Sequence, residues 1–144
     1  MIPCRTGTFA YLHPVSRGIS RKIWVRREPE SDELAEWLDA QAPAPWVSST
    51  LIEVELPRAL RRVDPSLLAR VPGIVSRVAR YEIDEVVRAA AGALPDPTLR
   101  SLDAIHLATG QTVFGTKLTA FVSYDERLLA AAASAGLPTV APGR

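Results

Sequence analysis

The sequence predicts an α/β fold built around a mostly parallel sheet. From residue 28 onward, short apolar runs that suit strands alternate with amphipathic segments that suit helices. The run 118–123 is apolar without alternating, as expected for a strand covered on both faces. A length of 144 residues suits one domain. We therefore expect an α/β domain over residues 28–144, with its cleft beyond the carboxyl ends of the strands.

The amino-terminal segment, residues 1–27, differs in composition from the rest of the chain. It contains no Asp or Glu, and residues 1–30 carry six Lys or Arg against two Glu, a net charge of +4. The remaining residues carry eleven Lys or Arg against fourteen Asp or Glu, a net charge of −3. Only residues 8–12 suit a short strand. We expect an atypical, poorly ordered segment, in which Pro14 and Gly18 argue against the amphipathic helix of a transit peptide.

The domain is expected to begin with a helix, a strand and a second helix. Ser31 suits the N-cap of the first helix, ahead of an apolar stripe at helical spacing. Residues 46–49 suit a short strand, and Thr50 and Glu53 match a capping box for a helix over 51–63. The apolar positions of the two helices are Leu34, Trp37, Leu38, Ile52, Leu56, Ala59, Leu60 and Val63.

The second half of the chain continues the alternation. The expected elements are, in order, a helix that begins at Ser66, a strand over 80–83, a helix capped by Asp84, a long helix from Thr98 to Phe114, a strand over 118–123, a helix over 124–135 and a strand over 137–141. Gly136 is placed to end the last helix, because glycine readily adopts the backbone conformation found there.

Several classes of function find no support in the sequence. The single cysteine, Cys4, cannot form an internal disulfide, and a cytoplasmic location is expected. No apolar run reaches the length of a membrane span, so we expect no membrane association. The motifs GxxxxGK[ST], GxGxxG and GxSxG do not occur. His13 and His106 are the only histidines, which argues against a Ser/His/Asp triad.

Three acidic residues stand at predicted ends of helices or strands. Glu55 follows the strand over 46–49, Asp103 lies near the start of a helix, and Asp125 follows the buried strand. Carboxylates at such positions can converge in space, and a cluster of them binds Mg²⁺ or Mn²⁺, because hard cations prefer oxygen ligands. Metal-assisted cleavage of phosphodiester bonds is therefore the leading hypothesis.

Each acid also has a simpler interpretation. Glu55 could lie on the surface and pair with Arg58 or Arg62, and Asp103 could pair with Arg100, three residues before it. Asp125 could serve only as an N-cap.

The remaining polar candidates are less specific. A helical histidine such as His106 is more often a packed or capping residue than a ligand or a base. Arg58 and Arg127 could contact an RNA backbone, although runs of charge usually form solvated faces.

Three sequence blocks carry a family resemblance. They are STLIEVEL from Ser49, LRSLDAIHLA from Leu99 and LTAFVSYDERL from Leu118. Together they resemble the conserved blocks of PIN-domain ribonucleases, above all the VapC toxins of bacterial toxin–antitoxin pairs. The resemblance implies a three-layer α/β/α PIN-like domain, Mg²⁺- or Mn²⁺-dependent endoribonuclease activity, a homodimer and a cognate antitoxin.

The resemblance also assigns roles to residues. Four acids surround the metal site of the family, and Glu55 matches the second, Asp103 the third and Asp125 the fourth. Ser123 matches a Ser or Thr that often forms hydrogen bonds in the site, and Thr50 is expected to support it.

One part of the family pattern has no match. The family opens with a strand that ends in Asp, and residues 1–27 contain no acid to take its place. We predict that this stretch is displaced from the ancestral reading frame or start. The alternative to an active nuclease is then a catalytically impaired PIN-like module that keeps only its antitoxin and dimer surfaces.

Overall fold

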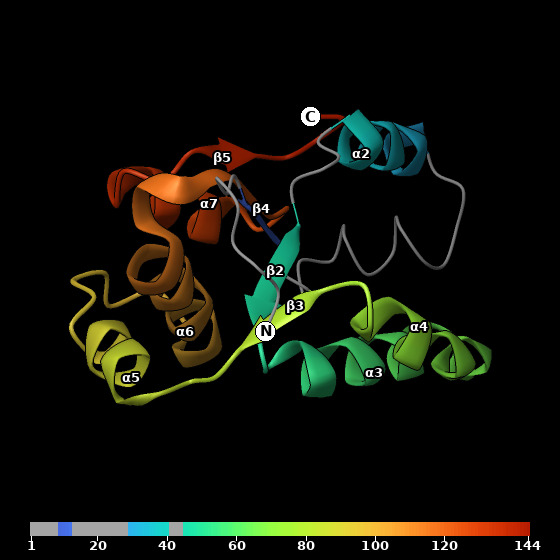
Figure 1. Cartoon of the computed structure of the whole chain (residues 1–144), viewed down its shortest axis with the longest axis horizontal. Coiled ribbons are helices and arrows are strands. Elements are labelled where there is room, and N and C mark those ends of the chain that lie inside the picture. The colour runs from blue at the N-terminus through green and yellow to red at the C-terminus, as the bar shows by residue number, and fades with distance from the viewer. Residues whose placement is uncertain (1–8, 13–28, 41–44) are drawn as a thin grey trace.

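The computed structural model describes residues 9–12, 29–40 and 45–144, and it contains a five-stranded sheet between two layers of helices (Figure 1). The strands are β1 (Phe9–Leu12), β2 (Trp46–Ser49), β3 (Ala79–Tyr81), β4 (Leu118–Val122) and β5 (Thr139–Val140). Their order is β3-β2-β1-β4-β5, and every neighbouring pair is parallel. The predicted α/β class and the three-layer architecture are confirmed.

The central strand comes from the amino-terminal segment. Tyr11 of β1 pairs with Val47 of β2 on one side and with Phe121 of β4 on the other. The strand expected near residues 8–12 is therefore formed, and the sheet includes four residues that precede the expected domain boundary. The expectations for residues 1–8 and 13–27, including disorder and a displaced reading frame, lie outside the described residues.

The helices divide between the two faces of the sheet (Figure 1). On one side lie α2 (Pro29–Ala40), α3 (Ile52–Val63), the 3-10 helix η1 (Pro65–Arg70) and α4 (Val71–Val75). On the other side lie α5 (Glu85–Gly92), α6 (Ser101–Thr109), the π-helical turn η2 (Gly110–Phe114), the 3-10 turn η3 (Gly115–Lys117) and α7 (Glu126–Ser134). None of the helices in the described part of the chain is long and apolar enough to span a membrane.

The core consists of two apolar clusters, one on each face of the sheet. The first joins Leu34 of α2 and Leu60 of α3 with Ala120 and Val122 of β4. The second includes Phe121, which lies between these two β4 residues in the sequence and points to the opposite face. The continuous apolar character of β4 thus follows from burial on both sides, as predicted.

Two predicted helix caps, at Ser31 and in the Thr50–Glu53 capping box, are wrong. α2 begins at Pro29, before Ser31, and proline suits the first turn of a helix. α3 has Leu51 as its N-cap and no side-chain capping bond. The expected capping-box residue Glu53 instead forms an ion pair with Arg80, at 3.0 Å from Nε to Oε1.

Two further helix starts differ from the prediction, because a neighbouring Asp makes the capping bonds. Asp64, rather than Ser66, caps η1, and its carboxylate accepts the Ser66 N–H at 2.9 Å. α6 begins at Ser101, after an Asp96 carboxylate that binds the backbone N–H of Thr98 at 2.8 Å and its hydroxyl at 2.7 Å. The hydroxyl of Thr98 is thus committed to Asp96 and does not cap a helix.

The long helix expected from Thr98 to Phe114 is also divided. α6 ends at Thr109, and a π-helical turn follows it to Phe114. The hydroxyls of Thr109 and Thr112 donate to the carbonyls of Ile105 and Ala108, four residues earlier, at 2.7 and 2.8 Å. Such back-bonding disturbs the regular helical ladder.

Candidate active site at the carboxyl edge of the sheet

The sheet brings the predicted site residues to one edge. β2 ends at Ser49 and β4 ends at Val122, and these two strands flank β1 in a parallel sheet. Their carboxyl ends therefore lie at the same edge, where α/β proteins commonly bind ligands. α3 follows β2 and carries Glu55, while α7 follows β4 and begins after Asp125.

Glu55 is a buried carboxylate. Its residue is only 8% exposed, and Oε2 lies 2.6 Å from Nε2 of His106, which is fully buried on α6. The interpretation of Glu55 as a surface acid paired with Arg58 is therefore wrong. The sequence could not show this, because the partner of the carboxylate lies 51 residues further along the chain.

His106 connects Glu55 to the end of β2. Its Nδ1 lies 3.4 Å from the hydroxyl oxygen of Ser49, which is fully buried. The backbone N–H of Leu51 donates to the same hydroxyl oxygen at 3.3 Å. Sequence reasoning treated His106 as a packing or capping residue. The available signal was its position three residues after Asp103, since residues at that spacing share one face of a helix.

Asp125 and Ser123 form the turn between β4 and α7. The Asp125 carboxylate oxygen Oδ1 accepts the N–H groups of Arg127 and Leu128 at 3.0 and 3.1 Å. The Asp125 N–H donates to the hydroxyl of Ser123, a buried residue, at 3.1 Å. Asp125 is thus the N-cap of α7, as its simpler interpretation predicted. These bonds hold both side chains at the carboxyl edge.

The other predicted residues lie on α3, α6 and α7 and in the turn after β2. Asp103 is half-buried in the first turn of α6, one turn before His106. Thr50 is half-buried between β2 and α3, and its N–H donates to the carbonyl of Tyr81 at 2.9 Å. Arg58 on α3 and Arg127 on α7 are both exposed.

The three predicted acids do not form one cluster among the described residues. Among residues 9–12, 29–40 and 45–144, no three His, Cys, Asp or Glu side chains form a group that could hold a metal ion. The structure joins Glu55 to His106, and it does not add Asp103 and Asp125 to them as a ligand cluster. The convergence of three carboxylates stays a prediction.

The donors nevertheless suit a divalent cation in kind. The predicted site offers carboxylate oxygens, which Mg²⁺ prefers, and that ion is usually held by one or two carboxylates together with waters and substrate phosphates. Glu55 on α3 contacts His106 on α6, and Asp103 lies one turn before His106, so these two carboxylates could hold such an ion without a complete protein cage.

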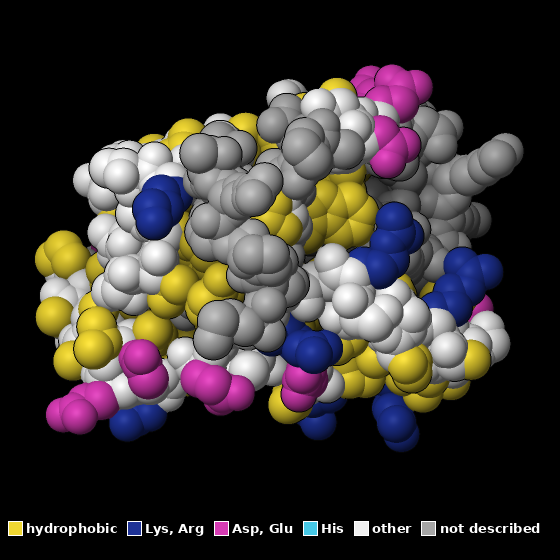
Figure 2. Space-filling model, in the orientation of Figure 1, with side chains coloured by type: hydrophobic (Ala, Val, Ile, Leu, Met, Phe, Trp, Pro, Cys, Tyr) yellow, Lys and Arg dark blue, Asp and Glu magenta, His cyan; other side chains and the backbone are white. Residues whose placement is uncertain are grey.

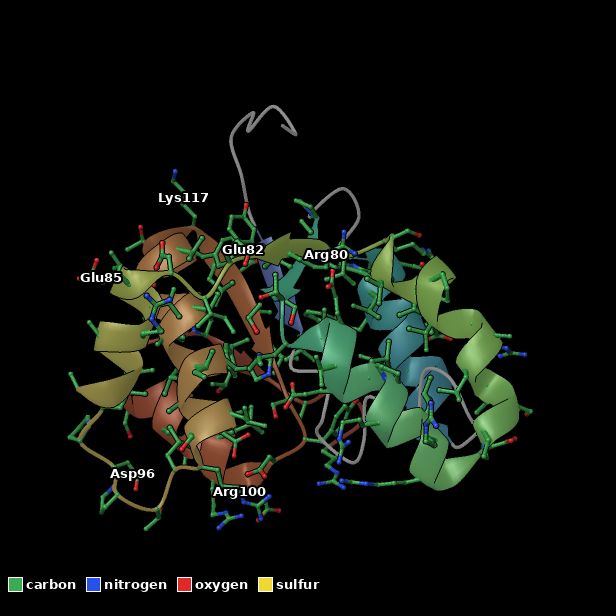
Figure 3. All side chains as sticks on the ribbon, turned by 90° about the horizontal axis from the view of Figure 1, so that it is seen from below. Arg80, Glu82, Glu85, Asp96, Arg100 and Lys117 are labelled. Carbon is green, nitrogen blue, oxygen red and sulfur yellow. The ribbon has the colours of Figure 1, made fainter. Side chains whose placement is uncertain are left out.

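Charge is distributed unevenly over the surface (Figure 2). The side of α3, η1 and β3 exposes six arginines, namely Arg58, Arg61, Arg62, Arg70, Arg77 and Arg80. The segment after β3 exposes Glu82, Asp84 and Glu85, and Figure 3 places Glu82 and Glu85 on the opposite side of the molecule from the loop that carries Asp96 and Arg100. The pKa of Asp96 is lowered by the hydrogen bonds from Thr98 and, to a smaller extent, by the positive charge of Arg127.

Comparison with known proteins gives the family. The PIN-domain pattern matches residues 21–134, a range that begins after β1. The chain is 53% identical over 121 residues to Ribonuclease VapC35 of Mycobacterium tuberculosis, which covers 83% of this chain and 90% of that protein. It is 40% identical over 119 residues to Ribonuclease VapC47 of the same species, covering 81% of this chain and 87% of the relative.

Ribonuclease VapC46 of M. tuberculosis is also 40% identical, over 118 residues that cover 81% of this chain and 87% of that protein. No solved structure matches the chain at a significant level. The parallel sheet, the acids at its carboxyl edge and these similarities agree. The chain therefore belongs to the PIN-domain family and, within it, to the VapC-type ribonucleases.

Proposed function

We propose that this protein is a divalent-metal-dependent endoribonuclease toxin that hydrolyses RNA phosphodiester bonds and is neutralised by a cognate antitoxin. The observation that carries the proposal is the buried Glu55 carboxylate, held 2.6 Å from His106 at the carboxyl edge of the sheet. Burying a carboxylate is costly unless it is paired, and two apolar clusters already supply a core without it. A role in metal binding would explain why this buried carboxylate is present.

The proposed roles follow the positions of the side chains. Glu55, Asp103 and Asp125 would hold Mg²⁺ or Mn²⁺, with Ser123 fixing the Asp125 turn and Thr50 supporting the start of α3. When bound, the ion would supply a polarised water and positive charge for the phosphate oxygens.

The protein's own contribution would be to fix the carboxylates of Glu55, Asp103 and Asp125 beside one another. Two exposed arginines, Arg58 on α3 and Arg127 on α7, would bind the phosphate backbone of RNA. The homodimer and the antitoxin are proposed from the family, which combines both with this activity.

A second candidate is a PIN-like module with impaired catalysis. It is favoured by the missing first acid: the residue that follows β1 in the sequence is His13, which lies outside the described residues. It is also favoured by the lack of a three-ligand group in the described part of the chain.

Cleavage of a fluorescent RNA mixture in Mg²⁺ or Mn²⁺ tests the proposal. We expect Asp103→Asn to reduce the rate by about 100-fold, comparable to the loss of one stabilising polar group in other active sites. Glu85→Gln is the matched control, because Glu85 is an exposed acid on α5. Equal rates for the wild type and Asp103→Asn would overturn the catalytic proposal.

The variant His13→Asp separates the two candidates. It restores an acid directly after the central strand. If the wild type is inactive and His13→Asp cleaves RNA in an Asp103-dependent manner, the impaired module is correct.

A further inference from the structure

We propose that His106 is a positioning residue for Glu55: through a buried imidazole, α6 fixes the carboxylate that α3 offers to the metal. This inference rests on the proposed function, because it concerns how the proposed site is assembled. The established family pattern of acids does not include this histidine among the residues matched above.

His106 and Glu55 form a short contact. At 2.6 Å, Nε2 of His106 and Oε2 of Glu55 are within the range of a strong charge-assisted hydrogen bond. An ionised carboxylate can only accept, so the proton of this bond belongs to Nε2. Both residues are buried, so water competes poorly for the bond.

The other ring nitrogen of His106, Nδ1, faces Ser49. The hydroxyl oxygen of Ser49 accepts the N–H of Leu51 at 3.3 Å, which leaves its hydrogen to be donated elsewhere. Nδ1 of His106 lies 3.4 Å from that oxygen and can accept it. Ser49 thus contacts the second ring nitrogen, and the imidazole is held from both sides while Nε2 faces Glu55.

These contacts connect α3, β2 and α6. The chain of bonds runs from the N-cap of α3 through the last residue of β2 to His106 on α6, and then back to α3 at Glu55. Asp103 lies one turn before His106 on the same helix. His106 therefore fixes the orientation of the α3 carboxylate relative to the α6 carboxylate.

Mn²⁺ binding to the full chain, measured by calorimetry, tests the inference. We expect His106→Leu, which keeps a similar volume but cannot donate, to weaken Mn²⁺ binding about 10- to 100-fold, as for other residues that orient metal ligands. His106→Gln can place an amide N–H near the position of Nε2, and its affinity should lie between those of the wild type and His106→Leu. Equal affinity for all three proteins would overturn the inference.

Long-range ¹⁵N NMR of the metal-free protein gives a second readout that does not depend on activity. We expect Nε2 of His106 to carry a proton at neutral pH, because it donates to Glu55. An Nε2 without a proton in the wild type would overturn the inference, even if His106→Leu fails to fold.

The outcomes separate this inference from the proposed function. Mn²⁺ binding that depends on His106, in a wild-type protein that cuts no RNA, overturns the proposed function and supports the inference. RNA cleavage and Mn²⁺ binding that are both unchanged in His106→Leu support the proposed function and overturn the inference. A wild type that binds no Mn²⁺ overturns both.

Discussion

The carboxylates of this protein differ in the groups that form hydrogen bonds with them. Glu55 has a histidine from a distant helix, Asp125 has the backbone of its own helix, and Asp64 and Asp96 have the residue two positions later. Sequence reasoning predicted the local bonds of Asp125, because an Asp before a helix finds its donors within three residues, but it placed Ser66 and Thr98 as caps where Asp64 and Asp96 make the bonds. It failed at Glu55, whose partner is brought close only by the sheet.

The two exposed aspartates give a prediction for acid stability. Hydrogen bonds from Ser66 lower the pKa of Asp64 below its ordinary value of 3.8, and those from Thr98 lower the pKa of Asp96 in the same way. A lowered pKa in the folded state stabilises the protein above the unfolded value, and this contribution is lost as the pH falls through the folded value.

The double variant Asp64→Asn/Asp96→Asn should therefore show a smaller decrease in melting temperature than the wild type between about pH 5 and pH 2. Thermal unfolding followed by circular dichroism at stepped pH measures this. The same substitution at the exposed Asp39 serves as the control. Parallel pH curves for the double variant and the wild type would contradict the prediction.

At the level of elements, predicted positions were more reliable than predicted ends. β2 has its predicted bounds, and β4 differs by one residue, because strongly apolar runs in a layered fold have few alternatives to burial. Helix starts were wrong wherever two capping residues lay close together, as at Asp64 and Ser66. The start of α5 was right, since Asp84 has no such competitor and accepts the Val87 N–H at 2.9 Å.

The cap of α5 leads to a stability prediction. Asp84→Ala removes the acceptor for the Val87 N–H and should lower the free energy of unfolding by about 1 kcal/mol. Urea denaturation at neutral pH measures the change. Glu85→Ala is the matched control, because Glu85 is the next residue and makes no capping bond. Equal losses in both variants would show that the cap contributes nothing specific.

For the whole molecule, the sequence predicted the α/β class and a short strand near residues 8–12, and the family resemblance supplied the three-layer architecture. The central place of this strand in the sheet was not predicted, because its four residues lie in a segment without a persistent period. The position of β1 in the sheet depends on its pairing with β2 and β4, and the local sequence does not indicate those partners. The convergence of the acids is undetermined for the same reason.

The two apolar clusters lie on opposite faces of the sheet, which makes their contributions separable. Leu128→Ala in the second cluster should cost about 2–5 kcal/mol, and Ile74→Val in the first about 0.5–1.5 kcal/mol. Because the sheet separates the sites, the double variant should lose the sum to within about 0.5 kcal/mol. Chemical denaturation of the four proteins measures this. A larger deviation would mean that the clusters are coupled through the strands.

The position of β1 has a consequence for synthesis. The ribosome makes this strand first, yet one of its two neighbours, β4, is among the last strands to be made. Contacts between such distant segments form slowly, and an incomplete chain leaves strand edges exposed. A nascent chain therefore cannot place β1 between both of its neighbours until Val122 has left the ribosome. Until then β1 keeps one unpaired edge, which a chaperone or a second nascent chain could bind.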